Sequence, residues 1–394
     1  MKILHIAPTP FFSNRGCHIR IENIMCISES FAKCSVCTYH HGDDIQNREI
    51  HRIWTIPGYH SRTAGFSIYK ILADVFLLLL VLGKTLKGSP HLLHGHLHEG
   101  ALIAWTVRTL LFWRHLPVVM DMQGSLSREL VTYKTFGEQS LWIRFFRKVE
   151  SWICRLPDHF ICSSDASRRI LIEDFGVKQE KVTLLMDTVP KGFMNGFDRE
   201  SCRKLLGLSK DNLLILYTGS LLPGKGLEII LEMMPAVMQQ YPQIKFCLAG
   251  YPVKETRRRV LELGVENAIL LPGEVPYFQL PKFLAAADIA LEPKTGSSGE
   301  ASGKLMHYMV ALLPVVCFKT PNNVQFLGKD AVYASEETGE AFKEALCRII
   351  ESESLRTRLQ LQMRTRSYPI KEEVSHAKVL AAVYASMIPK GVMA

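Results

Sequence analysis

Short apolar runs alternate with amphipathic stretches along the first half of the chain. The apolar runs have the length of buried strands and read KILHIAP, SVCTY, HLLHGH, PVVMDMQ and HFICSS. Between them, residues 19–31 and 101–113 place apolar side chains at helical spacing. Such alternation is typical of a parallel sheet covered by helices. The first half therefore predicts an α/β domain.

The alternation stops after Asp187, in a stretch of glycines and polar residues typical of a linker, and then restarts. The later apolar runs read LLILYTG, IKFCLAG, AILLPG, ADIALEP and LPVVCF. The whole pattern predicts two Rossmann-like, doubly wound α/β domains, residues 1–195 and 196–371. Ligands of such domains bind at the carboxyl ends of the strands, so we expect the ligand in a cleft between the domains.

The most apolar run covers residues 71–82 and reads ILADVFLLLLVL, between Lys70 and Lys84. A helix that crosses a membrane needs about 20 apolar residues, so this run is too short. We favour a buried helix packed on the sheet. The alternative is a helix on a membrane surface, with Lys84 and Lys87 at its end.

Residues 141–156 combine aromatic and basic side chains at helical spacing and read LWIRFFRKVESWICRL. We favour a helix packed on the sheet with its basic residues in solvent. The alternative is a surface that contacts anionic lipid. No nucleic-acid-binding module accompanies the stretch, so we expect no nucleic-acid partner.

Composition fits these predictions. The chain has 394 residues, 47% hydrophobic and 22% charged, which is enough for two packed domains. Its net charge of +9 favours anionic partners. The amino terminus reads as a strand rather than as a signal peptide. We therefore expect a cytoplasmic protein, with contact to the inner face of a membrane as the added possibility.

Two groups of residues raise the question of a metal site. They are Cys34 and Cys37 with His40 and His41, and the run of His96, His98 and Glu99. Structural zinc takes four ligands, and no second cysteine pair follows the first at zinc-site spacing, so we favour cysteines of the core. No carboxylate-rich group accompanies the histidines, and we expect no metal.

A glycine-rich turn, TGSLLPGKG at residues 218–226, joins a predicted strand to a predicted helix. A strand, a glycine turn, a lysine and a helix start commonly bind phosphate. A nicotinamide-dependent oxidoreductase would need Gly-x-Gly-x-x-Gly after a strand. Neither this turn nor the loop after the first strand has that spacing, which disfavours such an enzyme.

The order of these motifs resembles the family 4 retaining glycosyltransferases of the GT-B fold, also called group 1. The C-terminal half carries the resemblance in YTGSLLPGKGLEIIL, IKFCLAG, ILLPGEVPYFQLPKFLAAADIALEP and GEASGKLMHYMVALLPVV. The N-terminal half carries it in LHGHLHEGA, PVVMDMQGSL and KVESWICRLPDHFICSSDASRRIL. It implies acceptor binding by residues 1–195 and nucleotide-sugar binding by residues 196–371. It also implies a helix within residues 372–394 that crosses back onto the first domain.

The resemblance implies a role for the glycine turn, where the family holds the donor diphosphate with an arginine and a lysine. Lys225 fills the lysine position and Ser220 the arginine position, next to Gly219. A fixed cation stabilises the departing diphosphate, whereas serine cannot replace an arginine fork. In the family, the glycine loop of the first domain faces the donor phosphates when the cleft closes, which implies this role for Gly16. Arg15, beside it, is a candidate for the second cation.

Two acids of the family contact the donor sugar and the ribose. By the resemblance, Glu300 contacts the sugar and His307, in the second position, contacts the ribose; a histidine on the helix surface is the equal alternative. Glu292 also satisfies the family spacing, but it ends a predicted strand and we leave it unassigned. Gly303 and Lys304 begin the next helix, whose amino end favours phosphate.

The acceptor side of the family often carries a histidine where this chain has Gln123, which can bond a sugar hydroxyl but is no acid or base. Asp121 is expected to point to the other side of the strand. His98 and Glu99, at another strand end, are further acceptor-side candidates. Arg15 joins them as a candidate. The acceptor is expected to be a saccharide or a lipid-linked molecule.

Two functions follow. The first is a glycosyltransferase that moves a hexose from a nucleoside-diphosphate sugar, without a cofactor, in synthesis of a cell-envelope glycan, exopolysaccharide or glycolipid. Its catalytic candidates are Lys225, Glu300 and Gln123. The second is a catalytically impaired GT-B protein that binds a sugar nucleotide as a scaffold subunit, since Ser220, His307 and Gln123 depart from the family pattern. We favour the enzyme.

Overall fold

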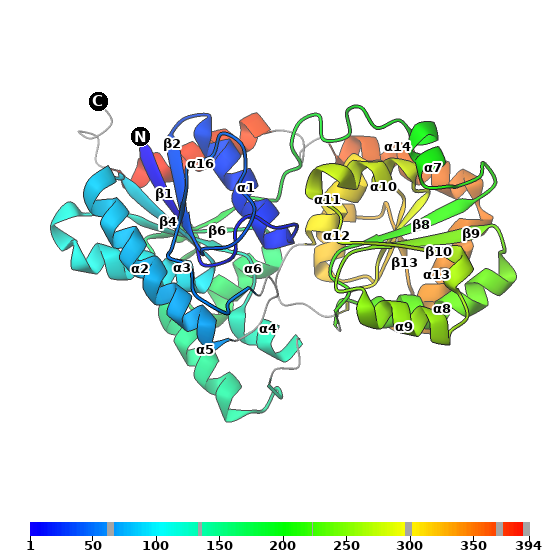
Figure 1. The fold of residues 1–394 in the computed structure, drawn as a ribbon, viewed down its shortest axis with the longest axis horizontal. Coiled ribbons are helices and arrows are strands. Elements are labelled where there is room, and N and C mark those ends of the chain that lie inside the picture. The colour runs from blue at the N-terminus through cyan, green and yellow to red at the C-terminus, as the bar shows by residue number, and fades with distance from the viewer. Residues whose placement is uncertain (61–66, 133–135, 223, 296–301, 368–372, 389–394) are drawn as a thin grey trace. The chain divides into compact units, whose positions relative to one another are not determined.

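The chain divides into two compact α/β units, each built on a fully parallel sheet covered by helices (Figure 1). The computed structural model describes residues 1–60, 67–132, 136–222, 224–295, 302–367 and 373–388. Unit 1 comprises Met1–Asp187 and the C-terminal segment from Glu373, and unit 2 comprises most of the chain between. The predicted fold class is therefore confirmed.

Unit 1 contains a seven-stranded sheet in the order β3-β2-β1-β4-β5-β6-β7. Its strands are β1 Lys2–Ala7, β2 Lys33–Thr38, β3 Ile50–Arg52, β4 Leu92–His96, β5 Val118–Met122, β6 His159–Cys162 and β7 Val182–Leu184. Its helices are α1 Gly16–Glu29, α2 Ile68–Gly88, α3 Leu97–Leu110, η1 Phe112–Arg114, α4 Leu126–Thr132, α5 Leu141–Ile153, α6 Asp165–Arg169, η2 Ile170–Asp174, η3 Gln179–Lys181 and α16 Glu373–Met387.

Unit 2 contains a six-stranded sheet in the order β10-β9-β8-β11-β12-β13. Its strands are β8 Leu213–Thr218, β9 Ile244–Ala249, β10 Ile269–Gly273, β11 Ile289–Glu292, β12 Val315–Cys317 and β13 Val332–Tyr333. Its helices are α7 Arg199–Leu205, α8 Leu227–Gln240, α9 Lys254–Glu262, η4 Glu266–Ala268, η5 Tyr277–Gln279, α10 Leu280–Ala286, α11 Gly303–Val310, α12 Pro321–Leu327, α13 Gly339–Glu351 and α14 Glu353–Arg366.

The strand order of each sheet reverses direction once, beside its first strand. In unit 1 this point lies between β1 and β4, and in unit 2 between β8 and β11. Loops that leave the two strands at such a point diverge to opposite faces and leave a crevice at their carboxyl ends, where ligands of open α/β sheets bind. The topology therefore directs the search for a site to the residues that follow these four strands.

Unit 1 is packed on both faces of its sheet. Helices α1 and α16 cover one face, where Leu380 and Tyr384 join Ile3 in a core cluster, and α2 and α3 cover the other. Cys34 belongs to the first cluster and Cys37 to the second, so the two thiols lie on opposite faces and cannot hold one ion together. Burial raises the pKa of both thiols to about 12, as expected of core cysteines.

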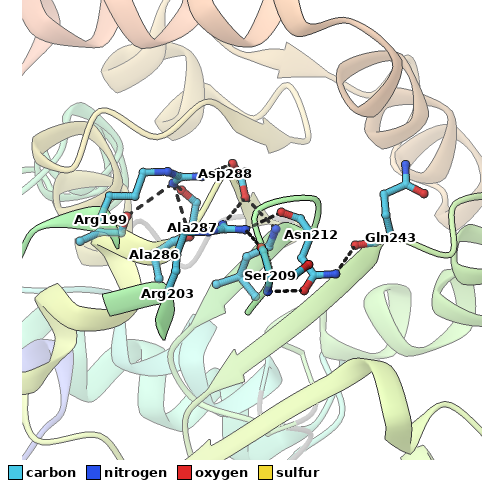
Figure 2. Close-up of polar contacts among 10 residues, drawn as sticks. Arg199, Arg203, Ser209, Asn212, Gln243, Ala286, Ala287 and Asp288 are labelled. Atoms are coloured by element: carbon cyan, nitrogen blue, oxygen red, sulfur yellow. Dashed lines mark hydrogen bonds and ion pairs between the residues drawn. The ribbon is translucent and has the colours of Figure 1, made fainter. Parts of the chain in front are cut away.

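The boundary between the units lies after Asp187 rather than after residue 195. Asp187 is bonded to Arg20 within unit 1, whereas Phe193 packs against aromatic rings of unit 2. Figure 2 shows how α7 is then fastened to unit 2: Arg203 donates to the carbonyls of Ala286, Ser209 and Asn212, and Arg199 donates to that of Ala287. Both guanidinium groups also pair with Asp288 at the start of β11, at 2.5 and 3.1 Å.

Residues 71–82 form a helix packed on the sheet, as favoured, but the expectation that this helix is buried holds for one side only. They lie within α2, whose residues Ala73, Leu77 and Val81 are buried against the sheet while a second apolar stripe faces outward. The run of apolar residues hid this division because it shows no polar face at helical spacing. Within the described residues, no helix has both the length and the apolar character needed to cross a membrane.

Candidate functional site

The glycine turn after β8 lies at the reversal point of the unit 2 sheet and has little space for side chains. A Cβ atom at Gly250, after β9, would meet the carbonyl oxygen of Gly219 at 1.7 Å. Gly226 has a φ of +81°, and a Cβ there would meet the carbonyl oxygen of Pro293 at 2.3 Å. Glycine at these positions therefore lets three chain segments approach one another, which is what a turn that cradles a phosphate requires.

A buried tyrosine fixes the two ends of this turn. The hydroxyl of Tyr217, on β8, donates to the carbonyl of Ser220 at 3.0 Å and lies 3.4 Å from that of Lys225. Both turn residues are half-buried, and Lys225 lies two residues before the start of α8. The sequence predicts that Ser220 and Lys225 lie in one turn. In the structure, Tyr217 holds the backbone carbonyls of both residues in place.

Lys304, predicted to contact the donor, is held by an ion pair. Its Nζ lies 2.9 Å from Oε2 of Glu292, which is buried at the end of β11, and 4.4 Å from the centre of the Tyr217 ring. Its Cε is also the nearest atom to a Cβ built on Gly219. Glu292, to which the sequence pattern assigns no role, therefore belongs to the site as the partner of Lys304.

Helix α11 points its amino end at the same reversal point. It begins at Gly303, and its N-cap residue Ser302 makes no side-chain capping bond. The hydroxyl of Tyr308, one turn into α11, accepts hydrogen bonds from the backbone nitrogen and hydroxyl of Thr218 at 2.9 and 3.1 Å, which ties the helix to β8. The first backbone N–H groups of a helix lack internal partners and attract anions.

His307, the predicted ribose contact, is buried rather than exposed on the helix surface. Its side chain contacts the hydroxyl of Tyr277 through Nε2 at 3.1 Å and the carbonyl of Gly303 through Nδ1 at 2.8 Å. Phe193 packs against the same ring. The alternative of a helix-surface histidine is therefore wrong, and a ribose contact remains a prediction that would require Tyr277 to give up its bond.

We expect His307 to make the stability of the protein depend on pH. Burial lowers the pKa of its imidazole to about 4, whereas the unfolded chain binds the proton near 6.5. Between these values the unfolded state binds more protons, so the free energy of unfolding falls as pH falls from 6.5 to 4. Urea unfolding at several pH values measures this slope.

The matched variant for this prediction is His307→Gln, which keeps a hydrogen-bonding side chain but cannot titrate in this range. Its stability should fall less steeply than that of the wild type over the same window, because the other buried histidines contribute equally to both proteins. Equal slopes would show that His307 is not held neutral.

The described part of this site does not include three residues predicted on the donor side. Glu300 falls outside the described residues, so its role stays a prediction. Arg15 and Gly16 lie in unit 1 at the start of α1, after the reversal-point strand β1. A Cβ at Gly16 would meet no atom within 4 Å, so packing in the described structure does not require glycine there.

On unit 1, Asp121 and Gln123 contact each other, so the expectation that they point to opposite sides is wrong. Gln123 Nε2 donates to Asp121 Oδ2 at 2.9 Å. Residues two apart on a strand share a face, and the earlier expectation misapplied this period. Asp121 is fully buried and also pairs with Arg20 on α1, at 2.7 Å. It is thus occupied by structural partners, and Gln123 is the half-buried residue of the two.

A histidine cluster beside Asp121 was missed. His5 on β1 and His94 and His96 on β4 are fully buried, and their ligand atoms lie within 4.8 Å of one another, which could hold a metal ion. His96 contacts His5 at 3.1 Å and Asp121 at 3.2 Å, and His94 bonds the hydroxyl of Tyr384 at 2.6 Å. The sequence could have indicated part of this cluster, because His94 and His96 are two residues apart and therefore share a strand face. His5 could not be added, because it is remote in sequence. Through Tyr384 the cluster joins α16 to the sheet.

His98 and Glu99, predicted on the acceptor side, point in different directions. His98 pairs with the buried Glu150 at 3.2 Å; burial would lower its pKa, but hydrogen bonds to Cys154 and Glu150 raise it well above the usual value. Glu99 pairs with Lys70 at 2.6 Å, next to the carboxyl end of β4. Glu99 therefore lies at the reversal point of unit 1, whereas His98 holds α5 against α3.

Known proteins resemble both halves of the chain. Residues 31–186 match the family described as Glycosyltransferase Family 4, and residues 212–352 match Glycosyl transferases group 1. A D-inositol 3-phosphate glycosyltransferase of Acidothermus cellulolyticus is 22% identical over 160 residues, which is 38% of this chain. The match spans only 36% of that relative's length.

Solved structures match nearly the whole fold. A sucrose-phosphate synthase from Thermosynechococcus elongatus superposes with a TM-score of 0.81 at 16% identity, over 98% of both chains. HepE from Anabaena, in complex with UDP and glucose, superposes with a TM-score of 0.78 at 18% identity, over 98% of this chain and 100% of its own. The two Rossmann-like units therefore define a GT-B protein. The chain belongs to the group 1 glycosyltransferases of family 4.

Proposed function

We propose that this protein transfers a hexose from a nucleoside-diphosphate sugar to an acceptor hydroxyl, with retention at the anomeric carbon. The observation that carries the proposal is the convergence of the glycine turn, Lys225, Lys304 and the amino end of α11 at the β8/β11 reversal point. Two cations, partly balanced by Glu292, and unpaired backbone N–H groups suit a diphosphate. The UDP bound to HepE supports the same ligand class.

In this proposal the residues act on the leaving group. The bond between the anomeric carbon and the diphosphate oxygen breaks, and the acceptor oxygen bonds to that carbon on the same face. The acceptor proton passes to the departing diphosphate, so no protein base is required. Lys225 stabilises the charge that grows on the diphosphate, which lowers the barrier more than it tightens substrate binding. Positive charge from the protein makes a bound metal unnecessary in this scheme.

The remaining roles follow the family. Glu300 contacts the donor sugar, Gln123 orients an acceptor hydroxyl through its side-chain amide, and Glu99 borders the acceptor site. Gly16 and Arg15 are candidates for donor contacts, as the family resemblance implies. The acceptor is a saccharide or a lipid-linked molecule in cell-envelope, exopolysaccharide or glycolipid synthesis, and the protein acts in the cytoplasm.

The second candidate is a GT-B protein that binds a sugar nucleotide without transfer. The burial of His307, with both ring nitrogens bonded inside unit 2, favours it, because the family's second acid would contact the ribose. A sugar nucleotide that binds but is neither transferred nor hydrolysed, with any acceptor tested, would select this candidate.

The test is a thermal-shift screen of nucleoside diphosphates and their sugars. A donor at 100 times its dissociation constant should stabilise the native state by about 2.7 kcal/mol. The nucleotide that gives the largest shift is then used in transfer assays with Glu300→Ala as the comparison variant. A protein that no nucleoside diphosphate stabilises would contradict both candidates.

A further inference from the structure

Helix α2 carries apolar side chains on two opposite faces. One face is buried on the sheet, through Ala73, Leu77 and Val81. The outward stripe is between 43% and 75% exposed and consists of Ile68, Tyr69, Ile71, Leu72, Val75, Leu79 and Leu86. A surface helix normally turns polar residues outward, so this stripe indicates a contact that the isolated chain does not make.

The stripe continues onto neighbouring elements. Helices α2, α3 and α5 lie in succession on unit 1 (Figure 1), and Trp105 of α3 packs against Trp152 of α5. Arg114 of η1 donates to the carbonyls of Thr85 and Leu86 and so holds η1 against the end of α2. Exposed aromatic residues of these elements and of the β3–α2 segment are Trp54, Phe112, Trp113, Trp142, Phe145 and Trp152.

We call this surface the α2–α5 face: the outward stripe of α2 with these six aromatic residues. Its aromatic residues have the character of a membrane-interface belt, since an indole ring combines an apolar body with a polar N–H. Unit 2 differs. Its exposed large apolar residues are single side chains on separate elements, namely Leu205, Leu261, Phe278, Val324 and Leu361. Scattered exposure of that kind is normal in soluble proteins.

The exposed charges on α2 and α5 themselves have one sign. Exposed basic residues next to it are Lys87, Arg144, Arg147, Lys148 and Arg155. The one acid of α2, Asp74, accepts a hydrogen bond from Tyr39, and the one acid of α5, Glu150, is fully buried. An apolar, aromatic surface with a basic border is complementary to anionic lipid, whose headgroups attract the cations while the acyl boundary accepts the apolar side chains.

We propose that the α2–α5 face docks flat on an anionic lipid bilayer and that the acceptor is held in that membrane. The second statement rests on the proposed function. Lys70, near the start of α2, pairs with Glu99, near the start of α3, at the carboxyl end of β4 where an acceptor is expected. A bilayer against α2 therefore lies beside the acceptor end of unit 1, within reach of a headgroup-linked hydroxyl.

Vesicle sedimentation without any nucleotide tests the docking. The probes are vesicles of phosphatidylcholine alone and of phosphatidylcholine with phosphatidylglycerol. The wild type should bind the anionic vesicles and not the neutral ones. The pair Arg147→Glu and Lys148→Glu should weaken binding at least about 25-fold, since each basic residue near an anionic surface contributes about fivefold. The pair Val75→Ser and Leu79→Ser should also weaken it.

Matched controls lie in unit 2. Lys254→Glu with Arg257→Glu, both exposed on α9, makes the same change in net charge, and Leu361→Ser removes an exposed apolar side chain that is 66% exposed. Both controls should bind vesicles like the wild type, and urea unfolding checks that every variant folds. If the α9 control loses as much vesicle binding, the weaker binding is an effect of net charge alone. That result would overturn the proposal that the α2–α5 face docks on the membrane.

Other outcomes also decide. Failure to bind anionic vesicles, with dimers that dissociate in the Val75→Ser and Leu79→Ser variant, would assign the face to a second copy of the chain and overturn the proposal. If the protein binds anionic vesicles but no nucleotide stabilises it, the docking proposal stands and the proposed function is contradicted. Transfer to a soluble acceptor only, by vesicle-bound protein, would overturn the statement about the acceptor.

Discussion

Replacing Asp121 by alanine should destabilise the protein by about 3–5 kcal/mol, because it removes one partner of a buried ion pair. Oδ1 of Asp121 accepts a hydrogen bond from Nε of Arg20 at 2.8 Å and lies 2.7 Å from Nη2, and both side chains are buried. Burial would raise the pKa of Asp121, but Arg20 and His96 hold it well below the usual value. The alanine variant leaves the guanidinium of Arg20 with only Asp187 and the carbonyl of Leu185 as partners.

Urea unfolding measures this loss, and Asp174→Ala is the matched control. Asp174 pairs with Arg128 at 2.7 Å, but both side chains are partly exposed. Exposed pairs contribute about 0–1 kcal/mol, so the control should lose little. The comparison also separates two roles of Asp121. If Asp121 only contacts the acceptor, the Asp121→Ala variant would lose activity while its stability stays unchanged. That result would contradict the structural role of Asp121.

Replacing Lys225 by alanine should slow transfer about tenfold to 150-fold. A charge-assisted hydrogen bond contributes about 1.5–3 kcal/mol, and each 1.4 kcal/mol corresponds to about a tenfold change in rate. Lys304 shares its charge with Glu292 at 2.9 Å, so we assign the larger part of the stabilisation to Lys225. The measurement is steady-state transfer, or diphosphate affinity if transfer is absent.

Lys210→Ala is the control for this prediction, since Lys210 is an exposed lysine of the same unit. Ser220→Arg is the complementary variant. An arginine there restores the family's pair of cations and should tighten diphosphate binding. If Lys225→Ala changes neither rate nor affinity, the glycine turn has a purely structural role and the donor site lies elsewhere.

The fold and the main anion-binding turn could be predicted because both depend on local pattern. Short apolar runs separated by amphipathic stretches can only bury their side chains as a parallel sheet covered by helices. The turn at residues 218–226 was recognisable because a strand, glycines, a lysine and a helix start are contiguous in sequence. At Gly226 the reason for glycine is also partly local, in its positive φ.

The partners within the site could not be predicted, because they come from distant segments. The sequence pattern assigns Glu292 no role in the site. Its role is visible only in the structure, where the end of β11 brings it against Lys304. His307 proved buried because Phe193 and Tyr277, far apart in the chain, pack on its ring. Both cases depend on which side chains the packed sheet brings together.

The sequence by itself determined that this chain forms two Rossmann-like units and placed a phosphate-binding turn after the first strand of the second. Only the tertiary structure decided which apolar surfaces are covered. Apart from Asp74, residues 71–82 are apolar, and composition cannot distinguish a buried stripe from an exposed one. The sheet covers Leu77 and leaves Leu79 half exposed, because a sheet covers only one side of a helix that packs on it.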